Sequence, residues 1–529
     1  MMKPFLLAIL SGLLLSFGWP TYGFPLFLFV GFVPLLIAEQ YIRNSDSKNK
    51  KKVVFLAAYI TFLLFNLSTT WWLYFATPFG MIFANVANAF LMTLVFFIYH
   101  LIASRISTKL SLITLVCLWI GFEKFHLNWE MSWPWLNLGN GFANHYKWIQ
   151  WFEYTGVFGG TLWVWLINIL LFRSFLSFTS NKNFSLLIKQ ILLAVSIVVI
   201  GIFSSLYIYH TTEVPKEKVG VLVLQPNVNP YTEKYNVANA TMAQDLIDLA
   251  TEKLDSTVSF IIAPETTLPK PRALNTFQKT KEYYLLKDFI KKNNTATFLS
   301  GITFFNSYSE RETPNTTANF YRNSKKWYNS FNSSIFIQAN KNMETYHKSK
   351  LVVGVEHTPY RAVLNPILGN SMIDLGGSVS TLTTQKYRKV FSNGTNKMAP
   401  IICYESIYGE YVTEYIHKGA DFLAIITNDG WWNNSQGHKQ HLSMARLRAI
   451  ENRRSIARSA NTGISALINS KGDIEQSLAY EKKGVLKGNI STNKKITFYT
   501  QHGDYIFRIS MLTMVIILLA SFTRRRTSN

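Results

Sequence analysis

Three residues in the second half of the chain have side chains that acyl-transfer chemistry needs. Glu265 follows an apolar run and a proline, Lys348 lies in a short basic segment, and Cys403 ends the apolar run 398–403. A thiol nucleophile needs a base, and the tetrahedral intermediate of acyl transfer needs a cation or hydrogen-bond donors for its oxyanion. A carboxylate, an ammonium and a thiol that meet at strand ends would therefore form a competent acyl-transfer site.

Each of these residues also has a simpler interpretation when it is taken alone. A free cysteine at the end of an apolar strand is usually a small core residue, and a lysine in a basic segment is usually solvated. The chain has only two cysteines, Cys117 and Cys403, so a disulfide framework has no support. The catalytic interpretation depends on the combination of the three residues with the polar and aromatic motif 427–432.

The elements expected to position these residues alternate between strands and helices from residue 218 onward. Short β-branched and apolar runs predict strands, whereas apolar residues at helical spacing predict helices. This alternation is typical of an α/β domain. The predicted strands are 219–224, 258–262, 297–305, 329–338, 398–403 and 421–427, and the predicted helices are 242–254, 277–292 and 409–418.

The first 210 residues and the C-terminus consist mainly of long apolar runs. Only 16% of all residues are charged and 48% are apolar, which is typical of a membrane protein rather than of a soluble one. We expect a membrane domain of seven transmembrane helices at 1–210, an α/β domain at 211–500, and an eighth transmembrane helix with a basic tail at 501–529. The eight runs are 4–17, 24–38, 53–67, 82–102, 110–122, 156–172, 186–209 and 506–522.

The distribution of positive charge predicts the orientation of these helices. The formal net charge is +23, and basic residues gather in the loops 43–52, 105–109 and 173–182 and in the tail 524–526. Eight crossings that start from a cytoplasmic N-terminus place all four segments in the cytoplasm, as the positive-inside rule requires. The α/β domain is then extracytoplasmic. Because the rule accounts for these charges and no nucleic-acid motif is present, we expect no nucleic-acid partner.

Tryptophans mark the loops on the opposite side of the predicted membrane domain. They occur at Trp71 and Trp72 and along the stretch 129–151. Amphipathic rings of this kind favour headgroup depth, so we expect them to be interfacial anchors.

The order of these motifs resembles the nitrilase superfamily with its Glu-Lys-Cys triad and, more narrowly, the bacterial apolipoprotein N-acyltransferases. The resemblance covers nearly the whole chain. It departs at Ala263, where the family usually has tryptophan, and along 350–355, which leaves the shape of an acyl pocket open. The matching segments are Pro264-Glu265, Lys348 to Pro359, Cys403 to Glu405, Thr427 to Trp432, Gln440-His441, Arg446 to Glu451, Arg454, Arg458 and Asn461 to Gly463.

The resemblance implies a fold and an activity. The α/β domain would be an αββα sandwich facing the periplasm from the bacterial inner membrane. The enzyme would move an acyl chain from a phospholipid to the α-amino group of the N-terminal diacylglyceryl cysteine of an apolipoprotein. Glu265 would be the base, Cys403 the nucleophile, and Lys348 the oxyanion cation, helped by the backbone N–H of Tyr404.

Further residues are expected around this triad. Glu356 and Glu405 would orient Lys348 and hold the loop after Cys403. A wall of the pocket is the expected role of Tyr404, and Tyr235 and Trp432 are expected to contact substrate or to support the site.

A basic helix at 446–458 and two histidines invite other interpretations. In that helix Glu451 offers ion pairs at helical spacing, so a structural network is expected rather than a phosphate site. The residues His438 and His441 lack evident ligand partners in the sequence, so we expect no metal and no cofactor.

The sequence leaves two other functions open. The first is a membrane-tethered nitrilase-type amidase that hydrolyses a small amide, although a soluble substrate would need only one anchoring helix. The second is a channel or transporter, which would be expected to have ionisable residues in the middle of its spans, and the apolar runs contain few of these.

Overall fold

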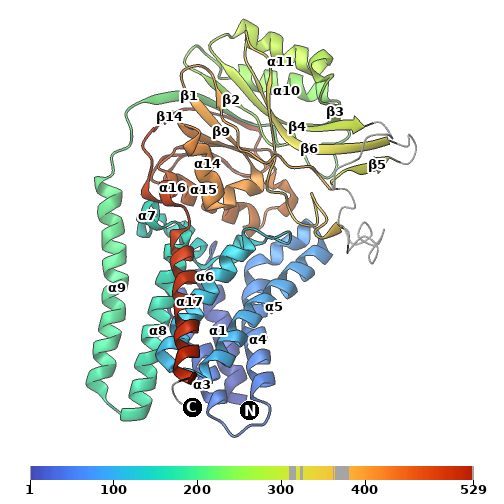
Figure 1. Cartoon of the computed structure of the whole chain (residues 1–529). Coiled ribbons are helices and arrows are strands. Elements are labelled where there is room, and N and C mark those ends of the chain that lie inside the picture. The colour runs from blue at the N-terminus through green and yellow to red at the C-terminus, as the bar shows by residue number, and fades with distance from the viewer. Residues whose placement is uncertain (1, 309–316, 322–325, 362, 364–380, 527–529) are drawn as a thin grey trace. The chain divides into compact units, whose positions relative to one another are not determined.

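The computed structural model describes residues 2–308, 317–321, 326–361, 363 and 381–526. The chain forms two compact units. The first comprises Met1–Tyr74, Phe79–Thr211 and His502–Asn529, and the second comprises Phe75–Pro78 and Thr212–Gln501. The first unit is helical, and the described sheets belong to the second (Figure 1).

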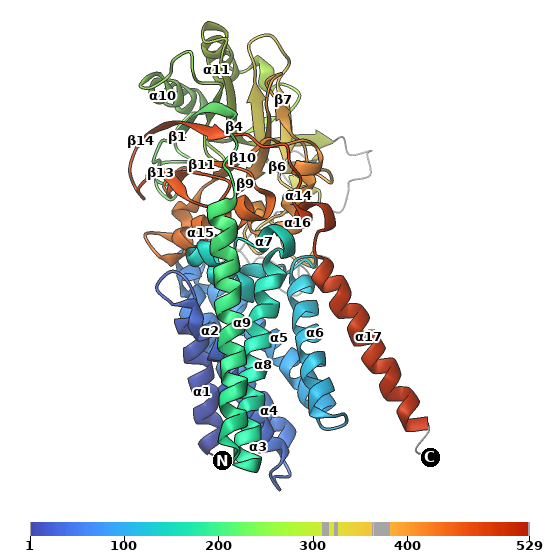
Figure 2. The ribbon, with the colours of Figure 1, turned by 90° about the vertical axis from the view of Figure 1, so that its left-hand side faces the viewer.

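A helix overlaps each of the eight apolar runs that the sequence predicts. Within the described residues, five segments are long and apolar enough to cross a membrane, whereas the apolar parts Met2–Phe17 and Tyr505–Ala520 are shorter. The long helices run alongside one another (Figure 2). The helices of this unit are α1 (Met2–Phe17), α2 (Leu28–Gly31), α3 (Val33–Arg43), α4 (Lys50–Thr70), α5 (Pro78–Ala103), α6 (Thr108–His126), α7 (Phe152–Thr155), α8 (Val157–Asn181), α9 (Phe184–Thr211) and α17 (Tyr505–Arg526), with short 3-10 turns η1 (Pro25–Phe27), η2 (Trp71–Phe75), η3 (Pro134–Leu136) and η4 (Leu138–Trp148).

The second apolar run is a broken helix rather than a continuous one. It divides at Phe32 into α2 and α3, and Pro34 lies in the first turn of α3. Asn168 of α8 satisfies the backbone at the break, because its side chain accepts from the Phe32 N–H and donates to the Leu28 carbonyl, both at 2.8 Å. Buried side-chain amides of this kind make a helix break tolerable in an apolar environment.

The prediction that the tryptophans are interfacial anchors is wrong for two of them. Trp72 and Trp135 are completely buried, and their ring centroids lie 5.0 Å apart. Trp133 stacks on Trp135 at 5.5 Å. These rings form a packed aromatic core, in which edge and face contacts replace contacts with lipid headgroups.

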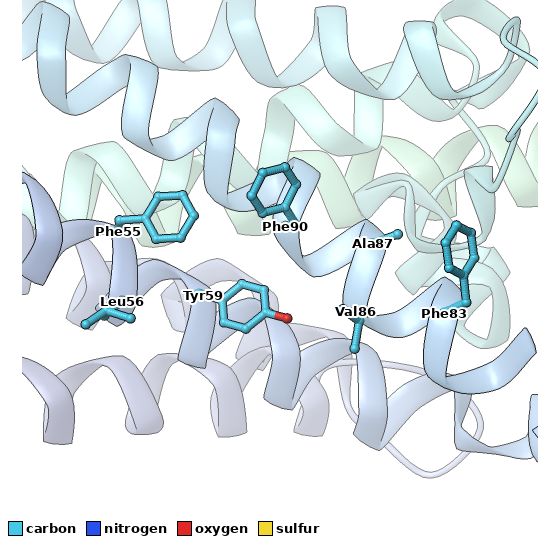
Figure 3. A pocket seen from close by; sticks show the side chains of 7 residues that line it. All are labelled: Phe55, Leu56, Tyr59, Phe83, Val86, Ala87 and Phe90. Carbon is cyan, nitrogen blue, oxygen red and sulfur yellow. The ribbon is translucent and has the colours of Figure 1, made fainter. Parts of the chain in front are cut away.

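An apolar pocket of about 400 Å³ lies between α4 and α5. Figure 3 shows Phe55 and Tyr59 from α4 and Phe83 and Phe90 from α5 along it. None of the residues that line it carries a charge.

Two sheets form the centre of the second unit. Among the described residues, the first sheet has the order β14-β1-β2-β4-β6-β5, with β3 beside β4 and β7 beside β6, and the second has the order β13-β12-β11-β10-β9-β8. The strands are β1 (Lys218–Gln225), β2 (Phe260–Ile262), β3 (Leu268–Ala273), β4 (Thr297–Tyr308), β5 (Asn319–Tyr321), β6 (Lys326–Ile337), β7 (Glu344–His347), β8 (Phe391–Ser392), β9 (Lys397–Ile402), β10 (Phe422–Thr427), β11 (Ile456–Ala460), β12 (Ser465–Ile468), β13 (Ile474–Leu478) and β14 (Gly484–Ser491).

The two sheets face each other, and helices cover their outer faces (Figure 1). Phe260 of β2 contacts Phe422 of β10 edge-on at 5.1 Å, and Phe336 of β6 stacks on Phe391 of β8 at 5.0 Å. Helices α10 (Asn239–Thr251) and α11 (Lys281–Lys292) cover the first sheet, and α14 (Gly409–His417) and α15 (Gln436–Asn452) cover the second. The unit is therefore an αββα sandwich, as the resemblance implies.

The predicted basic helix at 446–458 is wrong beyond residue 452. Helix α15 ends at Asn452, and Arg453 adopts a left-handed conformation with φ of 47° while its N–H donates to the last carbonyls of the helix. Such a cap ends a helix, and the chain then enters β11 in the middle of the second sheet. Within α15, Arg448 pairs with Glu451 at 2.7 Å, so the expected structural ion pair exists.

Candidate active site

Three chain segments that follow strands bring the predicted triad into one buried region. Glu265 follows β2, Lys348 follows β7, and Cys403 follows β9, so both sheets contribute. Their exposed fractions are 6%, 1% and 8%. Carboxylates and ammonium groups are rarely buried this completely unless they are paired, so their partners decide what the site can do.

Lys348 is held between two carboxylates. Its Nζ lies 2.9 Å from Glu265 and 2.9 Å from Glu356. Asn332 of β6 donates to the same two carboxylates, at 2.7 Å to Glu265 and 2.8 Å to Glu356. The backbone N–H of Val352 fixes the other oxygen of Glu356 at 2.8 Å. Glu356 therefore forms an ion pair with Lys348, and its role in orienting Lys348 stays a prediction.

These contacts determine the protonation states of the pair. Burial alone would raise the pKa of Glu265, but Lys348 and Asn332 outweigh burial and hold that pKa below its usual range. Burial would lower the pKa of Lys348, but Glu265 and Glu356 raise it well above its usual range. The resting site therefore contains an ionised Glu265 and a charged Lys348.

Cys403 lies at a strained turn directly after β9. Its φ is +50°, a conformation that costs free energy for a residue other than glycine. Its carbonyl accepts from Ser406 Oγ at 2.7 Å and from His441 Nε2 at 3.3 Å. These hydrogen bonds hold the strained turn in place.

The environment of Cys403 keeps its thiol protonated at rest. Burial raises the pKa of the thiol above its usual value, the charge of Glu265 raises it further, and Lys348 opposes both effects. A thiol in this state is a poor nucleophile on its own. It requires a base at the moment of attack, and Glu265 is an ionised carboxylate in the same site.

Glu405 joins the segment that carries Lys348 to the turn that carries Cys403. Its Oε1 accepts from the Ser349 backbone N–H at 2.7 Å and from Tyr346 Oη at 2.7 Å. The other oxygen accepts from the Ile402 N–H at 2.8 Å, and Tyr411 Oη donates to the group as well. A single buried carboxylate therefore fixes the backbone directly after Lys348 and directly before Cys403.

We expect Glu405→Gln to loosen both segments at once. The new NH₂ group faces donors instead of accepting from them, and a lost hydrogen bond to a buried charged group costs about 1.5–3 kcal/mol. The thermal unfolding temperature should fall, and alkylation of Cys403 by iodoacetamide should change in rate. Glu414→Gln is the matched control, because its half-exposed pairs with Arg388 and Lys418 contribute little. Equal unfolding temperatures for the two variants would contradict the bridging role.

A second buried cluster lies beside Cys403 and includes one of the two histidines. His441 Nδ1 lies 3.0 Å from Asp429, and Asp429 also pairs with Arg458 and accepts from Thr427. The expectation that His441 lacks potential ligand partners is wrong, since ligand atoms of Cys403, Asp429 and His441 lie within 4.8 Å of one another.

These atoms already have partners within the protein, however. Both Asp429 oxygens and both His441 nitrogens take part in hydrogen bonds, and the guanidinium of Arg458 would repel a cation. The cluster fits a network that supports the turn at Cys403 better than it fits a metal site.

The remaining predicted residues surround the triad at different depths. Tyr404 is buried and packs edge-on against Tyr408, with ring centroids 5.4 Å apart. Trp432 lies edge-on to the His441 ring at 5.5 Å. Tyr235 is 55% exposed, although the charges of Glu265 and Glu356 act on its hydroxyl. The roles of these aromatic residues and of the Tyr404 backbone N–H stay predictions.

Two polar residues of this site, Asn332 and Lys234, have no role predicted from the sequence. Asn332 lies within the predicted strand 329–338, where Ser333 and Ser334 follow it, so the local sequence does not single it out. Lys234 precedes Tyr235 in a loop and looks like a solvated charge in the sequence, yet it is only 2% exposed. Nothing in its local sequence indicates this burial.

Comparisons with known proteins identify relatives of both parts of the chain. Residues 11–170 match the model for the apolipoprotein N-acyltransferase N-terminal domain, and residues 220–495 match the carbon-nitrogen hydrolase model. An apolipoprotein N-acyltransferase of Chlorobaculum tepidum is 26% identical over 539 residues, covering 99% of this chain and 97% of that protein. Another, from Geobacter metallireducens, is 25% identical over 541 residues, covering 99% and 96%. Saccharomyces cerevisiae Nit3, of branch 10 of the nitrilase superfamily, is 14% identical with a TM-score of 0.36, covering 53% of this chain and 92% of Nit3.

The two family models divide this chain in the same order as its apolar and α/β parts. The carbon-nitrogen hydrolase model alone covers more than half of the residues, and the full-length relatives share both parts. The resemblance stated from the motifs is confirmed: the chain belongs to the apolipoprotein N-acyltransferase family of the carbon-nitrogen hydrolases.

Proposed function

We propose that this protein transfers a fatty acyl chain from a membrane phospholipid to the α-amino group of the N-terminal S-diacylglyceryl cysteine of apolipoproteins. The observation that carries the proposal is a neutral buried thiol beside an ionised Glu265 and a charged Lys348 in a member of this family. No cofactor is required, because the donor ester supplies the acyl group.

In the first half-reaction, Cys403 becomes acylated. Glu265 takes the thiol proton as Sγ attacks the ester carbonyl, and a C–S bond forms. Lys348 and the backbone N–H of Tyr404 stabilise the oxyanion, a role in which one donor is typically worth about 2.7–4 kcal/mol. The ester C–O bond then breaks, and Glu265 returns the proton to the leaving oxygen of the lysophospholipid.

In the second half-reaction, the amine replaces the sulfur. The α-amino group of the lipoprotein attacks the thioester, Glu265 takes one of its protons, and an amide C–N bond forms as the C–S bond breaks. The proton passes from Glu265 to the Cys403 thiolate, which restores the resting site. Hydrolysis competes with this step, so a slow acceptor requires a site from which water is excluded.

The proposal includes a location and a domain organisation. Eight crossings with a cytoplasmic N-terminus in the bacterial inner membrane place the catalytic domain in the periplasm, with domains at 1–210, 211–500 and 501–529. The positive residues of the loops 43–52, 105–109 and 173–182 support this orientation. Both substrates are then membrane-resident molecules on the same side as the catalytic domain.

Purified full-length protein in detergent provides the test. We expect incubation with a labelled phospholipid and a synthetic S-diacylglyceryl peptide to give lysophospholipid and N-acylated peptide in equal amounts. Omitting the peptide should leave a fatty acyl adduct on the protein. Release of ammonia from small amides without acylation of the peptide would instead establish the amidase.

A further inference from the structure

A second buried lysine lies beside the triad, and the mechanism above gives it no role. Lys234 belongs to the loop between β1 and α10, and its side chain is 2% exposed. The loop is fixed at several points: the Lys234 N–H donates to the Asn229 carbonyl at 3.0 Å, and Asn461 Nδ2 donates to the Val228 carbonyl at 2.7 Å. These contacts fix the loop, and the Lys234 ammonium therefore has a defined position in the site.

Both partners of the Lys234 ammonium adjoin the catalytic carboxylate. Nζ donates to the hydroxyl of Thr266, the residue directly after Glu265. With the Asn428 amide turned so that its oxygen faces these donors, Nζ also donates to that oxygen at 2.8 Å, and Trp431 Nε1 donates to it at 3.2 Å. The backbone N–H of Asn428 in turn donates to Glu265 Oε2 at 3.1 Å. Lys234 therefore supports the residues that hold Glu265.

The two lysines of the site differ in how their charges are balanced. Lys348 forms ion pairs with Glu265 and Glu356. Among the described residues, no carboxylate lies within ion-pair distance of Lys234, and both of its hydrogen-bond partners are neutral. Its charge nevertheless interacts electrostatically with Glu265 and Cys403, and its Nζ lies 6.0 Å from the centroid of the Tyr235 ring. The site thus contains a cation that no direct partner neutralises.

This cation matters because negative charge moves during acylation. At rest the charge lies on Glu265, where Lys348 and Asn332 stabilise it. When Glu265 takes the thiol proton, the charge moves to Sγ and then to the oxyanion. Building on the proposed function, we propose that Lys234 positions Glu265 and supplies the positive charge that stabilises Cys403 and the intermediate as the negative charge leaves Glu265.

A pH dependence follows from this role. Burial lowers the pKa of Lys234 to about 8, and the charges of Glu265 and Cys403 oppose that decrease. Above this pH the ammonium loses its proton, so acylation of Cys403 should slow as the pH rises through 8. The second half-reaction cannot report this effect, because the α-amine of the acceptor titrates in the same range and must be neutral to attack.

The test is therefore single-turnover acylation of the full-length protein by phospholipid without acceptor, followed by intact mass from pH 6 to pH 10. We expect the wild-type rate to fall above pH 8. Lys234→Gln keeps a hydrogen-bonding side chain but not the charge. Its acylation rate should be at least tenfold lower at pH 7 and should show no decrease above pH 8. Lys234→Arg should keep the charge and move the fall toward pH 10 or above.

Lys287→Gln is the matched control, because Lys287 is a half-buried lysine of the same domain that donates to the Gln338 and Lys341 carbonyls. Its rate and pH profile should equal those of the wild type. A wild-type rate that stays level from pH 7 to pH 9.5 would overturn the inference. So would a Lys234→Gln rate within threefold of the wild type.

A second measurement separates this inference from the proposed function. Alkylation of Cys403 by iodoacetamide, located by peptide mass, needs no acyl donor. Lys234→Gln should lower this rate at least tenfold at pH 7.5 while Lys287→Gln leaves it unchanged. If phospholipid leaves no adduct on the wild type, the proposed function fails. If the adduct forms and Lys234→Gln changes neither acylation nor alkylation, only the role of Lys234 fails.

Discussion

Cys403→Ala is expected to abolish both the acyl adduct and the transfer of the acyl chain. The sulfur forms the covalent intermediate, and the nearby Ser406 does not replace it, because its Oγ donates to the Cys403 carbonyl and contacts His441. Loss of the nucleophile of a catalytic triad can cost about 10⁶-fold in rate, which places the rate below detection. Intact mass after incubation with phospholipid measures the adduct directly.

Cys117→Ala is the matched control for that experiment. Cys117 is the other cysteine of the chain and is buried within α6. Its variant should keep the adduct and the full transfer rate. An adduct that persists in Cys403→Ala would move the nucleophile elsewhere, whereas loss of the adduct in both variants would indicate a folding defect.

Much of the fold could be predicted because its signals are local. The apolar runs coincide with helices, and the strands 219–224, 398–403 and 421–427 lie within one residue or two of β1, β9 and β10. Periodicity detects such elements because it reports which face of a short segment is buried. The exposed strand β13 shows the limit, since four of its five residues are exposed and no apolar pattern marks it.

The broken second helix and the end of α15 could not be predicted for a different reason. The break at Phe32 is stabilised by Asn168, which is 136 residues away. The sequence around Arg453 continues a helical pattern, but Arg458 pairs with Asp429 of a distant segment. In both places a contact between remote residues decides the local conformation, and tertiary contacts override local preference.

The candidate site shows the same division between local and distant information. Glu265, Lys348 and Cys403 follow strands, and motif order was sufficient to select them. Asn332 gains its place when the first sheet is assembled, and Lys234 gains its place only when both sheets contribute to the site. Glu405 is an intermediate case. Its position two residues after Cys403 is evident in the sequence, but its contacts with Ser349 and Tyr346 depend on the fold.

Glu265→Gln is expected to give the second-largest loss, about 10²–10⁴-fold in the rate of Cys403 acylation. An amide cannot accept the thiol proton, and general-base catalysis is typically worth this amount. In the pH profile of the acylation rate, the wild type should lose activity on the acid side only below the usual pKa range of a glutamate, because the pKa of Glu265 is lowered. This decrease is the acid limb of the profile. Base function is present above that pKa and is lost as the pH falls through it. The variant should lack this limb.

Glu282→Gln separates a lost base from a lost ion pair. Glu282 is another buried carboxylate of the same domain, and its partner is Arg272. Both substitutions remove a carboxylate that pairs with a basic side chain, so both should lower the unfolding temperature. Lys348 keeps Glu356 as a partner in Glu265→Gln, which limits that loss of stability. Only Glu265→Gln should slow acylation and remove the acid limb, because only Glu265 lies where the proton of the Cys403 thiol must go. A Glu265→Gln rate above one tenth of the wild type would assign the base to another residue.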